Sequence, residues 1–160
     1  MPIPANISIG ESVLFSPEGA DKNHVYFCLM ESSPEQNALV LLAPMWTYDI
    51  AVQGIKVQSN NRIYYGEHPF CKKDTISWIN HSAIKRQNKN YVLGYCERHY
   101  PRITEVLYAR IIKNFLTDVD RVPPKFYEWF EEMRTCRKIY CQSNPCDDFC
   151  ERAFFSKKKN

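Results

Sequence analysis

Short apolar segments closed by turn-forming stretches fill the first half of the chain, and they constrain its fold more than any other feature. The clearest are ISIGESVLF (7–15), HVYFCLM (24–30) and ALVLLAPMW (38–46), which SPEGADKN and ESSPEQN separate. Short runs rich in β-branched and aromatic residues between turn signals are typical of antiparallel strands. We therefore expect β structure from residue 7 to about residue 86.

Two further segments extend this pattern. GIKVQ (54–58) and RIYYG (62–66) flank Ser59-Asn60-Asn61, and asparagine tolerates the positive φ of a hairpin turn. TISWINHSAIK (75–85) then alternates apolar and polar residues. About six short strands in so few residues predict a small, strongly bent barrel.

The periodicity changes after the polar break at 87–90. Beyond Pro101 the apolar residues recur at helical spacing, and Pro101 suits a first helical turn; they are Ile103, Val106, Leu107, Ile111, Phe115 and Leu116. A second helix is predicted from Pro124 to about Tyr140, with Phe126, Trp129, Phe130, Met133 and Ile139 on its apolar side. The predicted class is α+β: a barrel over residues 1–90 and a helical extension over 91–160, packed together as one cooperative unit.

Composition fits one globular domain and restricts its partners only weakly. Apolar residues make up 44% of the 160 residues, enough to build a core. Lys and Arg exceed Asp and Glu by only 21 to 18, so charge permits RNA binding without arguing for it. The N-terminal residues have no signal-peptide pattern and no apolar run is long enough to span a bilayer, so we expect a cytoplasmic protein without a membrane partner.

Four of the seven cysteines gather near the C-terminus, at Cys136, Cys141, Cys146 and Cys150. A break at Asn144-Pro145 would bring them together in a hairpin. Three outcomes stay open: a structural zinc site, a nested pair of disulfides, or unlinked thiols. The spacing predicts a closed site, so no catalytic cofactor is expected.

The segment Tyr65-Gly66-Glu67-His68-Pro69-Phe70, followed by Asp74, Ser77 and Trp78, is where we expect the functional site. It brings a histidine, carboxylates and a hydroxyl together where the β half closes. The chain has no phosphate loop, nucleophile elbow or HExxH zinc helix that would specify a reaction.

Three features resemble the PemK/MazF-like toxin family over roughly residues 7–120: Gly10-Glu11-Ser12-Val13 opening the first strand, the apolar strand pair that follows, and GEHPF followed by Ser77. The resemblance implies an SH3-like barrel that acts as a dimer, cleaves single-stranded RNA without metal and pairs with an antitoxin protein. In that family an arginine near the first loop and a Thr or Ser after a central strand serve cleavage. Residues 16–24 contain no arginine and offer Lys22 and His24, whereas Thr47 matches the hydroxyl position.

The resulting hypothesis is a toxin-like RNA-binding protein or ribonuclease with Thr47, His68 and Ser77 as catalytic residues. Histidine suits acid and base steps near neutral pH, and His81 and His99 are further candidates. The predicted RNA-binding residues are Lys85, Arg86, Arg98, Tyr65 and Trp78, because cations hold phosphates and aromatic rings stack on bases.

Two alternatives remain from the sequence. His68-Pro69 could form a turn with the imidazole hydrogen-bonded to backbone or to Asp74, a purely structural role. The whole protein could also be a non-catalytic protein-interaction module, such as a defence or counter-defence factor. An RNA enzyme requires Lys85, Arg86 and Arg98 on the face of His68, whereas an interaction module would expose aromatic residues around Tyr64, Tyr65 and Trp78.

Overall fold

The computed structural model describes residues 6–17, 23–32, 38–49 and 61–143. Within these ranges the strands are β1 (Ser12–Phe15), β2 (His24–Glu31), β3 (Leu39–Asp49), β4 (Arg62–Ile63), β5 (Thr75–Ile79), β6 (Lys85–Asn88) and β7 (Cys96–Tyr100). The helices are the short 3-10 helix η2 (His81–Ala83) and α1 (Lys89–Tyr95), α2 (Glu105–Thr117) and α3 (Pro124–Ser143). The predicted strand GIKVQ (54–58) lies outside the described residues. No helix among those described is long and apolar enough to cross a membrane.

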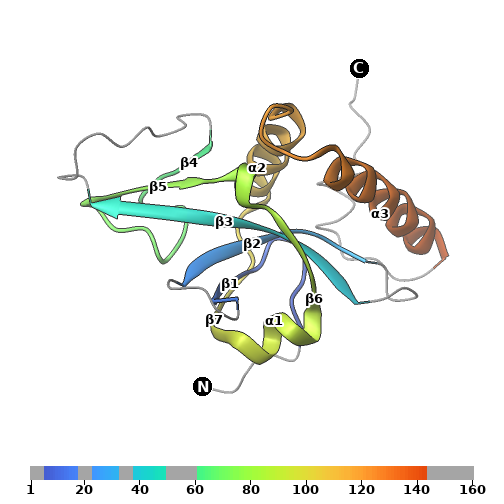
Figure 1. Ribbon diagram of the computed structural model, residues 1–160, viewed down its shortest axis with the longest axis horizontal. Coiled ribbons are helices and arrows are strands. Elements are labelled where there is room, and N and C mark those ends of the chain that lie inside the picture. The colour runs from blue at the N-terminus through green and yellow to red at the C-terminus, as the bar shows by residue number, and fades with distance from the viewer. Residues whose placement is uncertain (1–5, 18–22, 33–37, 50–60, 144–160) are drawn as a thin grey trace.

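One antiparallel sheet contains all these strands, in the order β4-β5-β3-β2-β1-β7, with β6 also paired to β3 (Figure 1). The long strand β3 pairs with β2 along one edge and with β5 and then β6 along the other. The predicted continuous strand 75–85 is therefore interrupted. Asn80 caps η2 by accepting a hydrogen bond from the Ser82 N–H, and the chain rejoins β3 at Lys85.

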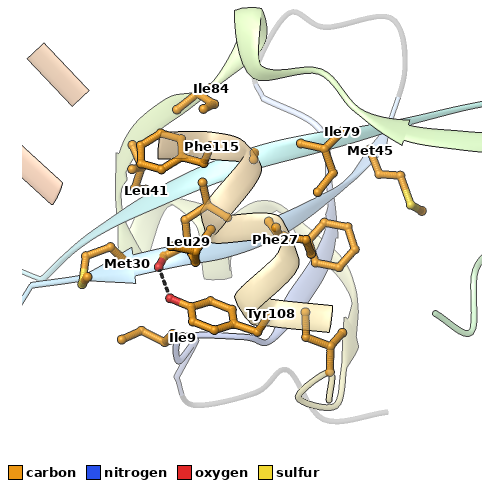
Figure 2. Packing of buried hydrophobic residues seen from close by; sticks show 14 of the residues in the cluster. Ile9, Phe27, Leu29, Met30, Leu41, Met45, Ile79, Ile84, Tyr108 and Phe115 are labelled. Atoms are coloured by element: carbon orange, nitrogen blue, oxygen red, sulfur yellow. Dashed lines mark hydrogen bonds between the residues drawn. The ribbon is translucent and has the colours of Figure 1, made fainter. Parts of the chain in front are cut away.

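The two faces of the sheet carry separate cores. Helices α2 and α3 cover one face, where Phe115 and Phe130 pack with Phe27, Leu29 and Leu41 (Figures 1 and 2). The other face is covered in part by α1, whose Val92 packs with a cluster from β1, β2 and β3: Val13, Phe15, Tyr26, Cys28, Val40 and Leu42. Alternation of side chains along each strand separates the two cores.

The predicted α+β class, an antiparallel sheet followed by helices, is confirmed. Within the described ranges β4 and β7 are the outer strands and do not pair with each other, so closure into an SH3-like barrel stays a prediction. The 91–160 segment also contributes β7, which pairs with β1. We did not predict α1 or β7, because 87–90 looked like a simple polar break; Asn88 instead caps α1 by accepting from the Asn90 and Tyr91 N–H groups.

Both long helices were predicted, with errors at their ends and surfaces. Pro101 is not in the first turn of α2: Thr104 is the N-cap and accepts from the Leu107 N–H, while the Ile103 N–H donates to the Gly10 carbonyl. Helix α3 begins at Pro124 as expected and runs on to Ser143. Val106 is 79% exposed and Ile139 61%, so neither belongs to the core to which its spacing assigned it.

Candidate functional site

A pocket of about 340 Å³ lies where β3 continues past the first residues of β2. Its walls come from the start of β2, from β3 and from the segment before β5; they are Asn23, His24, Val25, Met45, Trp46, Thr47, Tyr48 and Phe70. Aromatic and apolar groups dominate, and an amide, an imidazole and two hydroxyls are interspersed among them. Such a mixture suits a flat ligand that both stacks and forms a few hydrogen bonds.

Aromatic rings continue from this pocket across the sheet. His24 stacks on Trp46 with ring centroids 6.1 Å apart, Trp46 meets Trp78 at 6.2 Å, and Trp78 stacks on Tyr48 at 5.2 Å. Trp46 and Trp78 are direct cross-strand partners, and their side chains point away from the face that α2 and α3 cover. We call these four residues, His24, Trp46, Trp78 and Tyr48, the aromatic ladder.

Two exposed tyrosines follow β4, and cations lie over both rings. Tyr65 is 61% exposed with the Lys73 ammonium 5.6 Å from its centroid, and Tyr64 is 50% exposed with the Arg62 guanidinium at 5.0 Å. Tyr64 follows Ile63, which pairs with Ser77, the partner of Thr47. These tyrosines therefore emerge at the same end of the sheet as Tyr48.

An ion pair ties the tyrosine segment to helix α2. The Arg110 guanidinium donates to both carboxylate oxygens of Glu67 at 2.7 Å, and Glu67 also accepts from the Tyr64 N–H. These hydrogen bonds hold the pKa of Glu67 below its usual value, although burial opposes them with the largest single contribution. Gly66 has φ +91°, which lets the chain turn sharply before Glu67.

His68 is buried behind this surface and does not line the pocket. Its Nδ1 accepts a hydrogen bond from the Phe70 N–H at 3.1 Å, so the proton of the neutral ring is on Nε2, which donates to Ser12 Oγ at 2.7 Å. Burial lowers the pKa of His68 to about 4. Both nitrogens are engaged, so in this geometry the imidazole is not available to take a proton from a ligand. The backbone hydrogen bond is the one expected from a structural role.

Thr47 and Ser77, the other predicted catalytic residues, lie against each other. Their hydroxyl oxygens are 2.8 Å apart, as direct cross-strand partners on β3 and β5. Thr47 lines the pocket, whereas Ser77 is 1% exposed and lies behind it. Cys71 interacts with Ser77, and burial raises the pKa of its thiol. The structure therefore brings Thr47 and Ser77 together, while the hydrogen-bond partner of His68 is Ser12.

The predicted RNA-binding residues do not form one cluster in the fold. Tyr65 is exposed on the segment that leads to Phe70 of the pocket wall, and Trp78 is buried within the aromatic ladder. Lys85 and Arg86 pair with Leu42 and Leu41, roughly 10 to 13 Å along β3 from Met45, where the pocket wall begins, at ~3.3 Å per residue. Arg86 lies over Trp129 of α3, and Arg98 lies over Tyr100 on the outer strand β7. Lys85 and Arg86 are therefore on a different strand from Arg98, which lies over the Tyr100 ring that His68 also contacts.

The remaining candidate histidines are held by carboxylates. His81 Nδ1 donates to Asp118 at 2.9 Å, and burial lowers the pKa of this fully buried ring despite that partner. His99 lies 3.3 Å from Glu11. Both pairs connect neighbouring elements, and neither residue lines the pocket.

No group of three or more His, Cys, Asp or Glu residues in the described ranges could hold a metal. Cys136 is half-buried and packs on the core of α2 and α3. Cys146 and Cys150 lie outside the described residues, and the placement of the Cys141 side chain is not described. The zinc hypothesis therefore has no support here and stays a prediction.

Comparison with models of known families, with curated proteins and with solved structures finds no match to this chain. The PemK/MazF-like resemblance stays a prediction on that account. The pocket must be interpreted from its own residues.

Sequence reasoning placed the site near the GEHPF segment but missed most of the pocket wall. Asn23, Trp46 and Tyr48 line it without having been proposed for it, whereas Phe70 belongs to the predicted segment. The sequence contains a signal for two of these residues. Trp46 and Tyr48 alternate with Thr47 near the end of β3, beyond Met45, the last residue of β3 that β2 pairs. The sequence of β3 does not show where its partner strand β2 ends, so the pocket beyond that end could not be predicted from it.

Proposed function

We propose that this protein binds single-stranded RNA, without cleaving it, at the pocket and the exposed tyrosines beside it. The aromatic ladder leading into the pocket is the observation that carries this proposal. Stacking on aromatic side chains is how proteins hold unpaired bases, and every base offers a ring face. Tyr48 and Phe70, 37% and 36% exposed, would receive bases at the pocket mouth.

The charges near the pocket favour RNA over a protein partner. Lys72 and Lys73 are exposed directly after Phe70 and Cys71, and Lys73 accompanies Tyr65. Cations interleaved with aromatic rings suit a strand whose phosphates follow its bases. Lysine is instead depleted in the cores of protein interfaces.

Binding without cleavage follows from the surroundings of His68. Metal-independent cleavage needs a base near the 2′-hydroxyl and an acid near the leaving oxygen. Thr47 lines the pocket, but the observed partner of its hydroxyl is the Ser77 hydroxyl, which is not a base at neutral pH. His68 is buried with both ring nitrogens engaged.

A protein-interaction module is the second candidate, favoured by the exposure of Tyr64 and Tyr65. The two candidates differ in salt dependence. RNA binding weakens steeply with added salt, because phosphate contacts release counterions, whereas an aromatic protein interface responds little.

The test is fluorescence anisotropy with a short unstructured RNA labelled at one end, titrated at two salt concentrations. We expect saturable binding that weakens with salt, and Tyr65→Ala or Tyr48→Ala to raise Kd by about tenfold, within the range for loss of one stacked base. Tyr95→Ala is the matched control, since Tyr95 is a 44% exposed tyrosine on α1 that does not line the pocket. Equal weakening by Tyr95→Ala, or no saturable binding, contradicts the proposal and directs the search to a protein partner.

A further inference from the structure

His68 lies over a row of three residues that are cross-strand partners. Ser12 of β1 pairs with Phe27 of β2 on one side and with Tyr100 of β7 on the other. The imidazole contacts both aromatic rings, at 5.2 Å from Phe27 and 4.7 Å from Tyr100 between centroids, and bonds the small Ser12 between them. The GEHPF segment is thereby anchored to strands far from it in sequence.

The same ring holds Phe70 from behind. Nδ1 accepts the Phe70 N–H, and the Cys71 N–H donates to the His68 carbonyl at 3.0 Å, which closes a tight turn. The Phe70 side chain projects from this turn into the wall of the pocket. One histidine therefore connects the sheet to a pocket residue through two hydrogen bonds in series.

We propose that Ser12 and His68 are positioning residues that hold Phe70 as one wall of the ligand pocket. This inference rests on the proposed function for its ligand. The ion pair between Glu67 and Arg110 connects the GEHPF segment to α2 near Tyr64. Its hydrogen bonds do not involve the Phe70 backbone. His68 holds the turn that carries Phe70 on its N-terminal side, and the buried Cys71, which contacts Met45 and Ser77, holds it on the other.

Asparagine and glutamine at position 68 separate the two hydrogen bonds. The Oδ1 of asparagine lies near the position of Nδ1 and can still accept the Phe70 N–H, but it does not reach Ser12. Glutamine places a donor near Nε2 for Ser12 and offers no acceptor near Nδ1. Both variants lose the imidazole ring, so they are matched for the loss of packing on Phe27 and Tyr100.

The first measurement is hydrogen exchange of the Phe70 amide, which requires no RNA. We expect protection to fall by about tenfold or more in His68→Gln and to persist in His68→Asn, because only the latter keeps the acceptor. Equal exchange in the two folded variants overturns the positioning role. If one variant does not fold, Ser12→Ala replaces it in the comparison. This change removes only the hydrogen bond between Ser12 and His68, so it should raise exchange of the Phe70 amide less than His68→Gln does.

The second measurement is a double-mutant cycle for RNA affinity with His68→Gln and Phe70→Ala. If His68 acts through Phe70, the double variant binds no more weakly than Phe70→Ala alone. Multiplicative losses overturn the proposal, because they show an effect of His68 independent of Phe70. If wild-type protein binds no RNA, the proposed function fails, while the exchange measurement still decides whether His68 positions Phe70.

Discussion

The Tyr108 hydroxyl on α2 donates a 2.6 Å hydrogen bond to the carbonyl of Leu29 in the middle of β2 (Figure 2). The register of β2 against β3 shifts between Cys28 and Met30, so Leu29 lies in a bulge. A bulge leaves a buried backbone group without its ladder partner, and Tyr108 supplies one from the opposite layer. This bond joins helix and sheet at the centre of the larger core.

Tyr108→Phe should therefore lower the free energy of unfolding by about 1 to 3 kcal/mol, because the Leu29 carbonyl would stay buried without a donor. Urea denaturation followed by circular dichroism measures this change. Tyr65→Phe is the control, since its hydroxyl is on an exposed side chain and its loss should change little. A Tyr108→Phe variant as stable as wild type would show that the bulge carbonyl finds another donor.

The acid stability of the protein should depend on His68. Burial lowers its pKa from 6.5 to about 4, so below pH 6.5 a proton binds the unfolded chain in preference to the folded one. The contribution of the neutral ring is complete above pH 6.5 and is lost as the pH falls towards 4. The loss amounts to about 3 kcal/mol, at ~1.4 kcal/mol for each unit of pKa.

Urea denaturation at several pH values from 7 to 4 tests this dependence, with His68→Gln as the comparison. The variant should be less stable at pH 7 but should lose less stability on acidification. His81 contributes in the same direction, since burial also lowers its pKa, so some acid sensitivity should remain in the variant. Parallel curves for the two proteins would contradict the assignment.

A nearly buried ion cluster should hold α1 and α3 to the end of β2. The Glu31 carboxylate accepts from Lys89, the first residue of α1, and lies 3.4 Å from Arg137 of α3. Glu31→Gln leaves two cations without their counter-charge and should cost about 2 to 3 kcal/mol, since breaking a buried pair is expensive. Glu67→Gln removes a more exposed partner of Arg110 and should cost about 1 kcal/mol or less. Thermal unfolding of both variants compares them directly, and similar losses would contradict this ranking.

RNA should survive incubation with the protein in EDTA. Thr47→Ala and Ser77→Ala should then leave the RNA equally intact on a denaturing gel, because the Ser77 partner of Thr47 is not a base and His68 is buried with both ring nitrogens engaged. Cleavage by the wild type that is lost in either variant would revive the ribonuclease hypothesis and reject our proposal. The same outcome would restore Thr47 and Ser77 as catalytic residues.

The patterns along the chain were sufficient to predict which segments form strands and which form helices, but not where those strands and helices are interrupted. Alternation predicted β2 and β3, and helical spacing predicted α2 and α3, since each pattern reflects one buried face. The break at η2 was missed because Ile76, Trp78 and Ile84 continue the alternation across it. Val106 and Ile139 were misassigned because helical spacing does not tell which apolar residues the facing layer covers.

The same limit of sequence patterns applies to the candidate site. The residue types of the GEHPF segment were sufficient to make it a candidate site, whereas the burial of His68 could not be inferred from them. A histidine is a base or a structural donor according to what surrounds it. Here Ser12, Phe27 and Tyr100 come from three other strands, and only folding brings them to His68.

Local patterns along the chain were sufficient to predict β2, β3, α2 and α3, because propensity and periodicity act over a few neighbouring residues. The burial of His68, the contact between Thr47 and Ser77, and the shared pocket of Trp46 and Phe70 became visible only in the folded protein. Those relationships depend on strand order and register, which join residues distant along the chain. Burial and hydrogen bonding then determine what each side chain can do, and both are properties of the assembled sheet and helices.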